Sequence, residues 1–500
     1  MREIIGIDVG TTASKGILYD ELGNELAQKS LGYPLIQDKI NQAEEDPKII
    51  FDAVQRILFD LGTIAKQNNG ELVAISWSSQ MHSLIGLDEN FEPLTNSITW
   101  ADNRAQDEVE EGKQIYTKTG IPNHPMAPIY KLKWLKKENS NLFSHVRYWV
   151  GIKEYLIARL TGQLKEDITM AAGTGLMNLE NLTWDKNLLA NLGLQEKQLP
   201  TLGLPTDIAG YLTDEFSEKL NISQNVPIIL GASDGYLSTI GVGALNSNEF
   251  ALNVGTSGAI RTLIKQPLVD EKERFFTYAA PEKKYLIGGP VNNGGIVFSW
   301  VKNTFFGPNS TISDYFNAAQ TVPAGSNGLF FHPYLGGERA PIWNPDARGS
   351  FVGLTRNHTQ PQMARSVLEG IIYNLAGVAK TLSDQITRPD VLKVTGGFVK
   401  SDFIRQMIAD VFNVPVQTIK QEQGGGLGAF FMATLALGWE KEVKDIRKLI
   451  VEGKTYFPNP TNVKIYQSIL PIYREIENDL DQTYQRIAHW QESNPNMLNK

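Results

Sequence analysis

Ile5-Gly6-Ile7-Asp8-Val9-Gly10-Thr11-Thr12-Ala13-Ser14-Lys15-Gly16 stands near the start of the chain, and Phe250-Ala251-Leu252-Asn253-Val254-Gly255-Thr256-Ser257-Gly258-Ala259-Ile260 repeats its pattern far downstream. Each stretch predicts an apolar strand, a tight turn of glycine and hydroxyl residues, and a second strand. Glycine in such a turn lets backbone N–H groups approach an anion, and the hydroxyls add donors. One such turn is most often an ordinary hairpin. Two of them, with Asp8 ending the first strand, predict that the two halves of the chain hold one polyphosphate.

The composition is typical of a soluble globular protein. The chain has 500 residues, of which 42% are hydrophobic and 20% charged, and its formal net charge is -8. A chain of this length exceeds a single core, so two large domains are expected. The negative charge argues against a nucleic-acid partner or an anionic membrane surface. An anionic substrate would therefore need locally placed positive groups.

The chain contains no cysteine. Disulfides, zinc–thiolate sites and thiol nucleophiles are therefore excluded. The N-terminus enters a predicted strand at once and meets Asp8, which is unlike a signal peptide. The longest apolar stretch of note, 424–439, is glycine-rich and too short to span a bilayer. We therefore expect a cytoplasmic protein with no membrane partner.

The two halves of the chain follow a similar plan. Periodicity in the first half predicts strands at about 3–8, 14–19, 25–31, 72–78 and 226–230, and helices at 46–66, with Asp46 as its cap, and 236–242. The second half predicts strands at about 250–254, 258–264, 275–280, 284–288, 391–395 and 414–419, and helices from Gly294 and at 401–412. The segment from about 102 to 200 is expected to be mostly helical. The polar stretch near 244–249 separates two predicted domains, 1–246 and 247–490, and 491–500 is expected to be a disordered tail.

Two aspartates follow predicted strands. Asp8 beside the first turn is suited to a magnesium ion, directly or through water, because that metal prefers hard oxygen ligands; the alternative is an aspartate that caps the turn. Asp234 follows a buried strand, and open α/β folds keep their sites at the carboxyl ends of strands. There it could accept the proton of a sugar hydroxyl that attacks a γ-phosphate. The alternative is that Asp234 is the N-cap of the next helix.

Further residues are suited to binding a nucleoside and a polyol. Gly396-Gly397 follows a strand and leaves a flat backbone on which a nucleobase can lie, or is an ordinary strand-to-helix turn. The small-residue stretch 424–429 predicts a closely packed helix. Gln80-Met81-His82 and Trp100-Ala101-Asp102-Asn103-Arg104 combine amide, carboxylate, guanidinium and aromatic groups that suit a polyol. The alternatives are a surface ion pair after Trp100 and a core histidine at His82.

Five stretches resemble, in order, motifs of the FGGY carbohydrate kinases, a family with the actin-like ATPase fold. The stretches 8–12 and 253–257 resemble its phosphate motifs, and 395–405 resembles its adenosine motif. The family signatures are matched by 126–135 and by 349–354, which continues to Met363 and Glu369. The resemblance covers about 1–485. It implies an α/β protein with two ribonuclease H-like (actin-like ATPase) domains and a cleft between them.

The same resemblance implies ATP and Mg²⁺ as cofactors and a small sugar acid or polyol as substrate. Asp234 would be the catalytic base and Asp8 a metal ligand. The residues implied for binding the cofactor are Asp8, Gly10, Thr11, Thr12, Ser14, Lys15, Gly255, Thr256, Ser257, Gly396, Gly397 and Ser401. Those implied for the sugar are Gln80, Met81, His82, Trp100, Asp102, Arg104 and Asp234. A homodimer is a family-level expectation.

Substrate choice rests on three short stretches. Those at 81–83, 99–104 and 124–128 look most like the gluconokinase branch of the family, while the xylulokinase branch typically has glycine where this chain has Ser83. The resemblance therefore favours phosphorylation of D-gluconate to 6-phospho-D-gluconate, with Arg104 opposite the carboxylate. A xylulokinase, or another pentulose or polyol kinase, is the alternative. An actin- or chaperone-like ATPase, or a sugar-responsive regulator, would share the fold without the reaction.

Overall fold

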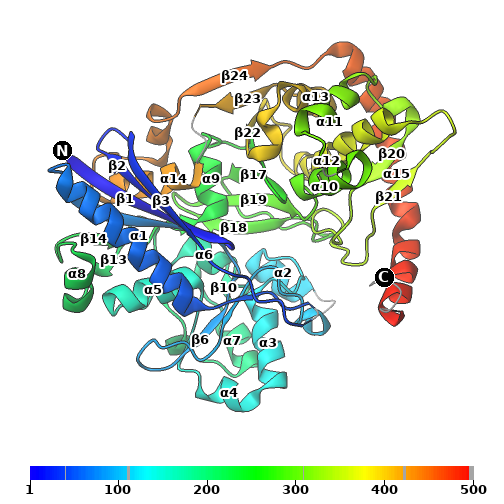
Figure 1. Cartoon of the computed structure of the whole chain (residues 1–500). Helices are drawn as coiled ribbons and strands as arrows, with labels where there is room; N and C mark the ends of the chain where they lie inside the picture. Colours follow the sequence, from blue (N-terminus) through cyan, green and yellow to red (C-terminus); the bar gives the residue numbers. More distant parts are fainter. Residues whose placement is uncertain (40, 110–112, 308, 421–423, 495–500) are drawn as a thin grey trace. The chain divides into compact units, whose positions relative to one another are not determined.

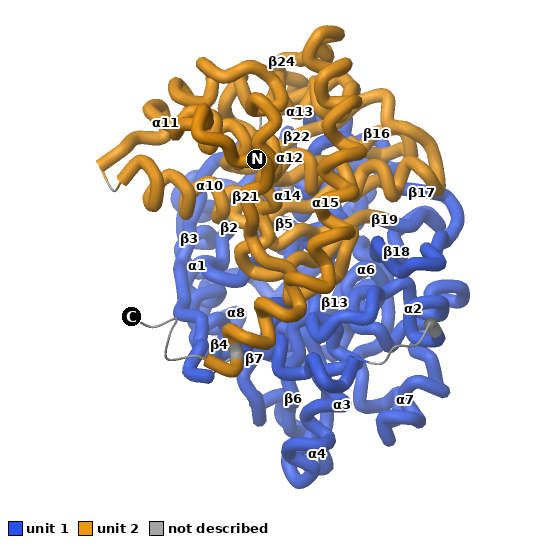
Figure 2. The backbone as a smooth tube through the Cα atoms, turned by 90° about the vertical axis from the view of Figure 1, so that its right-hand side faces the viewer, with its two compact units in different colours: residues 1–243, 263–286, 423–450 blue, residues 244–262, 287–422, 451–500 orange. Residues whose placement is uncertain are grey.

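The computed structural model describes residues 1–39, 41–109, 113–307, 309–420 and 424–494, and Figure 1 traces them. The chain forms two compact units, coloured in Figure 2. Unit 1 holds 1–243, 263–286 and 423–450, and unit 2 holds 244–262, 287–422 and 451–500. One seven-stranded sheet lies wholly in unit 1 and most of a second lies in unit 2, which confirms the predicted α/β class.

The units are not contiguous in sequence. The predicted boundary after residue 246 lies three residues beyond the first crossing at 243/244, and the chain then returns to unit 1 twice. One return contains α14 (Gly424–Ala436), whose Leu427, Phe430 and Ala433 pack in a buried cluster with Ile4 and Ile17. Burial of this apolar surface in unit 1 is the physical reason that a late segment joins an early one.

The sheet of unit 1 positions the first predicted turn. It has the order β13-β14-β5-β1-β2-β3, and β15 also pairs with β5. The strands are β1 (Arg2–Val9), β2 (Ala13–Asp20), β3 (Glu25–Gly32), β5 (Glu71–Ser79), β13 (Ile208–Tyr211), β14 (Pro227–Ile229) and β15 (Ala232–Ser233). The predicted strands at 3–8, 14–19 and 25–31 are confirmed and form the antiparallel meander β1-β2-β3, while β5 runs parallel to β1.

Alternation along β1 covers both faces of this sheet. Ile5 and Ile7 belong to the larger buried core, which also contains Trp77 of β5. Ile4 faces the opposite way, toward the cluster that contains α14, as a period of two requires. Helix α1 (Pro47–Gln67) lies along β2 and β3 on the larger core (Figure 1). Asp46 is its N-cap and accepts from Lys48 N at 2.8 Å, as predicted. Close packing of α14 is also confirmed, because a Cβ at Gly428 would lie 2.8 Å from Leu237 Cβ.

The second sheet carries the other predicted turn. Its order is β18-β19-β17-β16-β22-β23-β24, with β16 antiparallel to β17 and parallel to β22. The strands are β16 (Glu249–Val254), β17 (Gly258–Ile264), β18 (Phe276–Ala280), β19 (Lys284–Val291), β22 (Val391–Thr395), β23 (Val416–Ile419) and β24 (Glu452–Tyr456). The helices of unit 2 are α10 (Gly295–Val301), α11 (Ile312–Gln320), α12 (Gln360–Ser383), α13 (Asp402–Phe412) and α15 (Pro460–Ser493).

The middle of the chain alternates helices with short strands and irregular stretches. Its helices are α2 (Lys113–Thr119), α3 (Pro128–Glu138), α4 (Ser140–His145), α5 (Ile152–Thr161), α6 (Ile168–Ala172) and α7 (Lys186–Leu192). Short strands separate them, including β8 (Tyr148–Val150), β9 (Lys165–Asp167), β10 (Met177–Asn178) and β11 (Thr183–Trp184). The predicted disordered tail is wrong for 491–493, which continue α15, and Gln491 Oε1 there accepts from Arg348 Nε at 2.8 Å. Residues 495–500 of that tail lie outside the described residues.

Candidate active site

Three neighbouring strands of unit 1 end at one edge of the sheet. In the parallel register, Asp8 of β1 lies beside Ser78 of β5, and Ala232 of β15 lies on the other side of Ser78. Helix α9 (Asp234–Gly241) begins directly after β15. Asp8 and Asp234 therefore emerge at the carboxyl ends of adjacent strands, where α/β sheets place their ligands.

Asp234 is exposed and is the first residue of α9. The alternative that it caps this helix is wrong, because Ser233 is the N-cap and its hydroxyl accepts from Tyr236 N at 3.4 Å. Asp234 Oδ1 accepts from the adjacent Gly235 N at 2.6 Å. This local contact holds one carboxylate oxygen, and the side chain remains exposed to solvent. The arrangement suits a proton acceptor for an incoming hydroxyl.

Asp8 lies close enough to Asp234 for the two charges to interact. Desolvation raises the pKa of Asp8 to about 6, and the charge of Asp234 adds to that rise, while the Ser78 hydroxyl and Lys15 oppose it. Two neighbouring carboxylates that disfavour each other's charge are a fitting place for a cation. Among the described residues, no group of three or more His, Cys, Asp or Glu side chains could hold a metal. A magnesium ion here would take its other ligands from phosphate oxygens and water.

The first turn presents its hydroxyls in different directions. Gly10 N donates to Ala13 O at 3.1 Å, which closes the hairpin, and Thr12 is exposed. Thr11 Oγ1 instead donates to Gln80 Oε1 at 2.9 Å and accepts from Trp100 Nε1 at 2.9 Å. Thr11 thus ties the turn to both stretches predicted to bind a sugar.

Lys15 and Ser14, two predicted cofactor ligands on this hairpin, differ in how deeply their side chains are buried. Lys15 is half-buried and is the register partner of Asp8 across β1 and β2. Ser14 is fully buried, and its hydroxyl lies 3.3 Å from the Tyr33 hydroxyl. Because Ser14 faces the protein interior, we leave it out of the proposed nucleotide site.

Gln80 joins this network to a buried acid. Its Nε2 donates to Glu45 Oε1 and Oε2 at 3.2 and 2.9 Å, and both side chains are buried. Burial raises the pKa of Glu45 to about 8, although hydrogen bonds from Gln80 and Ser97 act to lower it. A neutral Glu45 is therefore the main form at neutral pH.

Asp102 and Arg104 form an ion-paired unit with Glu44. Arg104 Nε lies 3.1 and 3.0 Å from the Asp102 oxygens, and its Nη2 contacts Glu44 Oε1. Asp102 is buried and also accepts from Ala43 N at 2.9 Å, while the guanidinium lies over the Trp134 ring at 4.5 Å. The unit has two negative charges and one positive charge. Because Arg104 is already paired with two carboxylates, direct binding of a substrate carboxylate, as expected from the sequence, would have to displace one of them.

His82 and Met81 line the same region. The carbonyl of Gly173 can only accept, so His82 Nδ1 donates to it at 2.7 Å, and Nε2 lies 3.4 Å from the Tyr278 hydroxyl. Met81 is buried against Gly173, where a Cβ would lie 2.6 Å from Met81 Cε. Thus His82 is half-buried with both ring nitrogens held by this part of the fold.

A buried lysine holds the two sugar-site stretches together. Lys131 on α3 is fully buried, and its Nζ donates to His82 O, Ile98 O and Thr99 O at 2.5, 3.1 and 2.7 Å. Burial lowers its pKa to about 7, with Asp102 acting in the opposite direction. Lys131, Glu44, Glu45 and Tyr278 were not singled out from the sequence. The acidic pair at 44–45 was visible there, but nothing local linked it to residues 80 or 104.

Unit 2 places its predicted residues at the ends of two adjacent strands. Thr256 is exposed in the turn after β16, and Gly295 N donates to Gly255 O at 2.8 Å, which anchors the turn to α10. Gly396 follows β22 with φ 105°, and a Cβ there would lie 2.3 Å from Val254 O. Only glycine suits that position. The turn thus keeps the β16 and β22 loops together at one sheet edge.

The remaining unit 2 residues differ in what surrounds them. Ser257 is half-buried in the β16–β17 turn, where its carbonyl accepts from Gly255 N at 2.9 Å. Gly397 is exposed and a Cβ there would meet nothing within 4 Å, which leaves room for a flat ligand. Ser401 is the N-cap of α13 and accepts from Phe403 N at 3.3 Å.

Glu45→Gln is expected to flatten the pH dependence of stability. The pKa of Glu45 is about 8 when folded against an ordinary value of 4.5, so the folded form binds an extra proton between those values. The stability that protonated Glu45 adds to the folded protein is therefore fully present below pH 4.5 and is lost as the pH rises through 8. The thermal midpoint of the wild type should fall more than that of Glu45→Gln between about pH 5 and pH 8.

The matched control is Glu44→Gln. The pKa of Glu44 is lowered, since hydrogen bonds from Asn96 and Arg104 outweigh the effect of burial. Glu44 therefore titrates below the range from about pH 5 to pH 8. The thermal midpoint of Glu44→Gln should fall across that range as much as the thermal midpoint of the wild type does. Parallel curves for the wild type and Glu45→Gln would contradict the assignment of a neutral Glu45.

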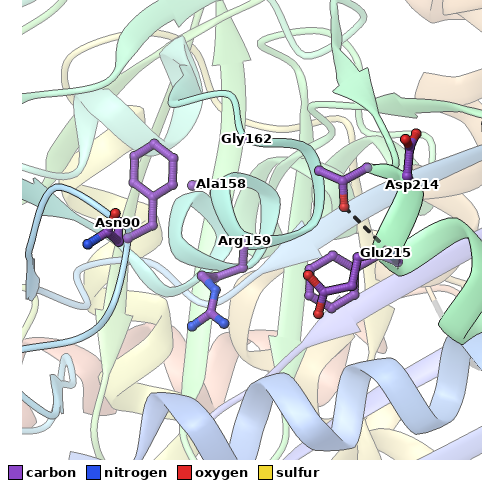
Figure 3. A pocket seen from close by; sticks show the side chains of 9 residues that line it. Asn90, Ala158, Arg159, Gly162, Asp214 and Glu215 are labelled. Atoms are coloured by element: carbon purple, nitrogen blue, oxygen red, sulfur yellow. Dashed lines mark hydrogen bonds between the residues drawn. The ribbon is translucent and has the colours of Figure 1, made fainter.

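A separate cavity lies away from these residues. It has a volume of about 600 Å³ and is lined by Asn90, Phe91, Ala158, Arg159, Gly162, Thr213, Asp214, Glu215 and Phe216 (Figure 3). None of the predicted site residues lines it. Arg159 in its wall is ion-paired with Glu92 at 2.7 Å and lies over the Phe51 ring. The positive charge of Arg159 is therefore already balanced by a carboxylate of the protein.

Across the described part of the chain, every helix is too short or too polar to traverse a bilayer.

Comparisons with known proteins cover nearly the whole chain. Residues 3–241 match the N-terminal domain of the FGGY family of carbohydrate kinases, and residues 250–437 match its C-terminal domain. A gluconokinase of Bacillus subtilis (strain 168) is 39% identical over 505 residues, with 98% of each chain covered. A xylulose kinase of Lactococcus lactis subsp. lactis (strain IL1403) is 32% identical over 489 residues, covering 95% of this chain and 96% of the relative.

Solved structures agree on the fold and differ in the substrate that they name. A gluconate kinase of Lactobacillus acidophilus has 55% identity and a TM-score of 0.95, covering 97% of this chain and 99% of the other. A ligand-bound xylulose kinase of the same organism has the same identity and TM-score, covering 97% of this chain and 100% of the other. Structural likeness therefore does not choose between the two substrates.

Proposed function

Because the chain belongs to the FGGY family of carbohydrate kinases, we propose that it transfers a phosphoryl group from ATP to D-gluconate, giving 6-phospho-D-gluconate. That the protein is a carbohydrate kinase follows from the family itself. The observation that carries the choice of gluconate is the 39% identity to a gluconokinase along 98% of the chain. Ser83, where the xylulokinase branch typically has glycine, supports the same choice.

Asp234 would remove the proton from the terminal hydroxyl of the sugar acid as that oxygen attacks the γ-phosphorus. Its exposed place at the edge of the unit 1 sheet, with one oxygen held by Gly235 N, supports this role. Phosphoryl transfer needs little covalent chemistry from the protein, so the remaining residues act by position and charge. The exposed hydroxyls of Thr12 and Thr256 and the backbone of their glycine turns would bind phosphate oxygens.

Asp8 would hold Mg²⁺, directly or through a water molecule. The ion, when bound, neutralises charge on the phosphate oxygens during transfer. Lys15, the register partner of Asp8, would add positive charge beside the same phosphates. Gly396 and Gly397 would provide the backbone surface for adenosine, in line with the open space at Gly397.

Xylulose is the second candidate for a specific reason. Arg104 is already paired with Asp102 and Glu44, so a direct contact with the carboxylate of gluconate would have to displace one of these partners, whereas an uncharged ketose needs no such contact. Gluconate remains the proposal because the gluconokinase relative has the higher identity over the full length.

A coupled kinase assay separates these substrates. ATP turnover would be followed with gluconate, xylulose, ribulose and glycerol, and also without sugar. Gluconate is expected to give the highest kcat/KM and the reaction without sugar a small fraction of it. A higher kcat/KM for xylulose would replace gluconate as the substrate, and equal turnover with and without sugar would instead indicate an actin- or chaperone-like ATPase.

A further inference from the structure

A fully buried ionic cluster contacts the segment that leads to Asp234. Lys153 and Glu154 on α5 and Asp167 at the start of α6 are all 0% exposed. Lys153 Nζ lies 2.7 Å from Asp167 Oδ2 and 3.1 Å from Glu154 Oε1. Removing such charges from water is costly, so a cluster of this kind is weak evidence for stability and calls for another explanation.

Asp167 connects the cluster to a short relay of hydrogen bonds. Its Oδ1 caps α6 by accepting from Thr169 N at 2.8 Å, and it also accepts from the Thr169 hydroxyl. Thr169 Oγ1 in turn accepts from Ser233 N at 2.9 Å. Ser233 is the residue directly before Asp234 and is the N-cap of α9. Ser233 N and Thr169 are both buried, so water does not compete for this bond.

The same lysine reaches the other end of the segment. Lys153 Nζ donates to Leu230 O at 3.2 Å. Between the two attachment points lies Gly231, with φ 65°, where a Cβ would lie 1.9 Å from Trp77 O. The backbone from 230 to 233 is therefore held at both ends by one buried network, across a turn that only glycine can make.

We propose that Thr169, Asp167 and Lys153 are positioning residues for Asp234: the relay fixes Ser233, and through it the direction in which α9 presents the catalytic carboxylate. This inference rests on the proposed role of Asp234. The ion pair orients the Asp167 carboxylate, Asp167 orients the Thr169 hydroxyl, and that hydroxyl holds the backbone next to the base. None of the three side chains needs to touch the sugar or the nucleotide.

Thr169→Val tests the relay with little change in shape. It removes the hydroxyl, leaves Ser233 N without its acceptor and keeps the β-branched side chain. We expect kcat to fall by roughly 10- to 100-fold, the size of effect that a displaced catalytic group produces, with KM for ATP and for the sugar little changed. Thr169→Ser keeps the hydroxyl and is the matched control, so its kcat should remain near that of the wild type.

A double-mutant cycle with Asp234→Asn separates positioning from a general structural role. If Thr169 acts through Asp234, then adding Thr169→Val to Asp234→Asn should lower the residual kcat little further. An equal loss in both backgrounds, or a wild-type kcat in Thr169→Val, would overturn the inference while leaving the role of Asp234 intact. A wild-type kcat in Asp234→Asn would overturn the proposed function itself. Should Thr169→Val be unfolded at the assay temperature, Asp167→Asn takes its place in the same cycle with the same expected outcomes.

Discussion

Asp234→Asn is expected to lower kcat for sugar phosphorylation by about two orders of magnitude or more. Asparagine keeps the shape of the side chain and its bond from Gly235 N, but it cannot take the proton of the attacking hydroxyl. Because Asp234 is exposed at the first position of α9 and Ser233 supplies the cap, the helix should remain intact. Steady-state kinetics and a thermal unfolding curve of the same preparation measure both expectations.

Asp214→Asn is the matched control for this variant. Asp214 is likewise the first residue of a helix, α8 (Asp214–Leu220), whose N-cap is the preceding Thr213. It lies at the separate cavity and not at the sheet edge that carries Asp8 and Asp234. Its kcat should stay close to the wild type. Turnover of Asp234→Asn at the wild-type rate would show that the carboxylate is not the base.

Asp8→Asn is expected to raise the Mg²⁺ concentration needed for half-maximal activity by about 10- to 100-fold. The amide is neutral and a weaker ligand than a carboxylate for a hard cation, whether it binds the ion directly or orients a bound water. The substitution also removes one of two interacting negative charges at the strand ends, so the folded protein should not be destabilised. A titration of activity with MgCl₂ at saturating ATP and sugar measures the shift.

Asp20→Asn provides the comparison at the opposite end of the same hairpin. Asp20 ends β2, and its Oδ1 accepts from Leu22 N and Asn24 N at 2.9 and 2.8 Å. Its Mg²⁺ requirement should equal that of the wild type. If Asp8→Asn also kept the wild-type requirement, Asp8 would be a structural residue of the turn and the metal would be held elsewhere.

Local features of the sequence predicted the elements that carry the site. The hairpin of β1 and β2 follows from alternating apolar residues around a glycine turn, and the start of α1 follows from Asp46 as its cap. The strand at 391–395 has the predicted bounds. These features depend on neighbours a few residues apart, so backbone sterics, capping and side-chain period are enough to predict them.

Distant contacts decided what those elements do. Ser233, and not Asp234, caps α9, because the register of β15 against β5 sets where the strand ends. Arg104 pairs with Glu44, which lies sixty positions earlier in the chain, and no local pattern in the sequence predicts this pairing. Helix α14 joins unit 1 because its apolar residues are buried there against β1.

The sequence alone determined the family and the α/β class, and it placed Asp8 and Asp234 close to the ends of strands, since each of these follows from motifs and short-range patterns. Tertiary structure alone decided which side chains are buried, which are already paired, and that Thr169 holds the backbone beside Asp234. The physical reason is that burial, pKa and hydrogen-bond partners are properties of packing between segments far apart in the chain, and the energies of those contacts exist only once the segments meet.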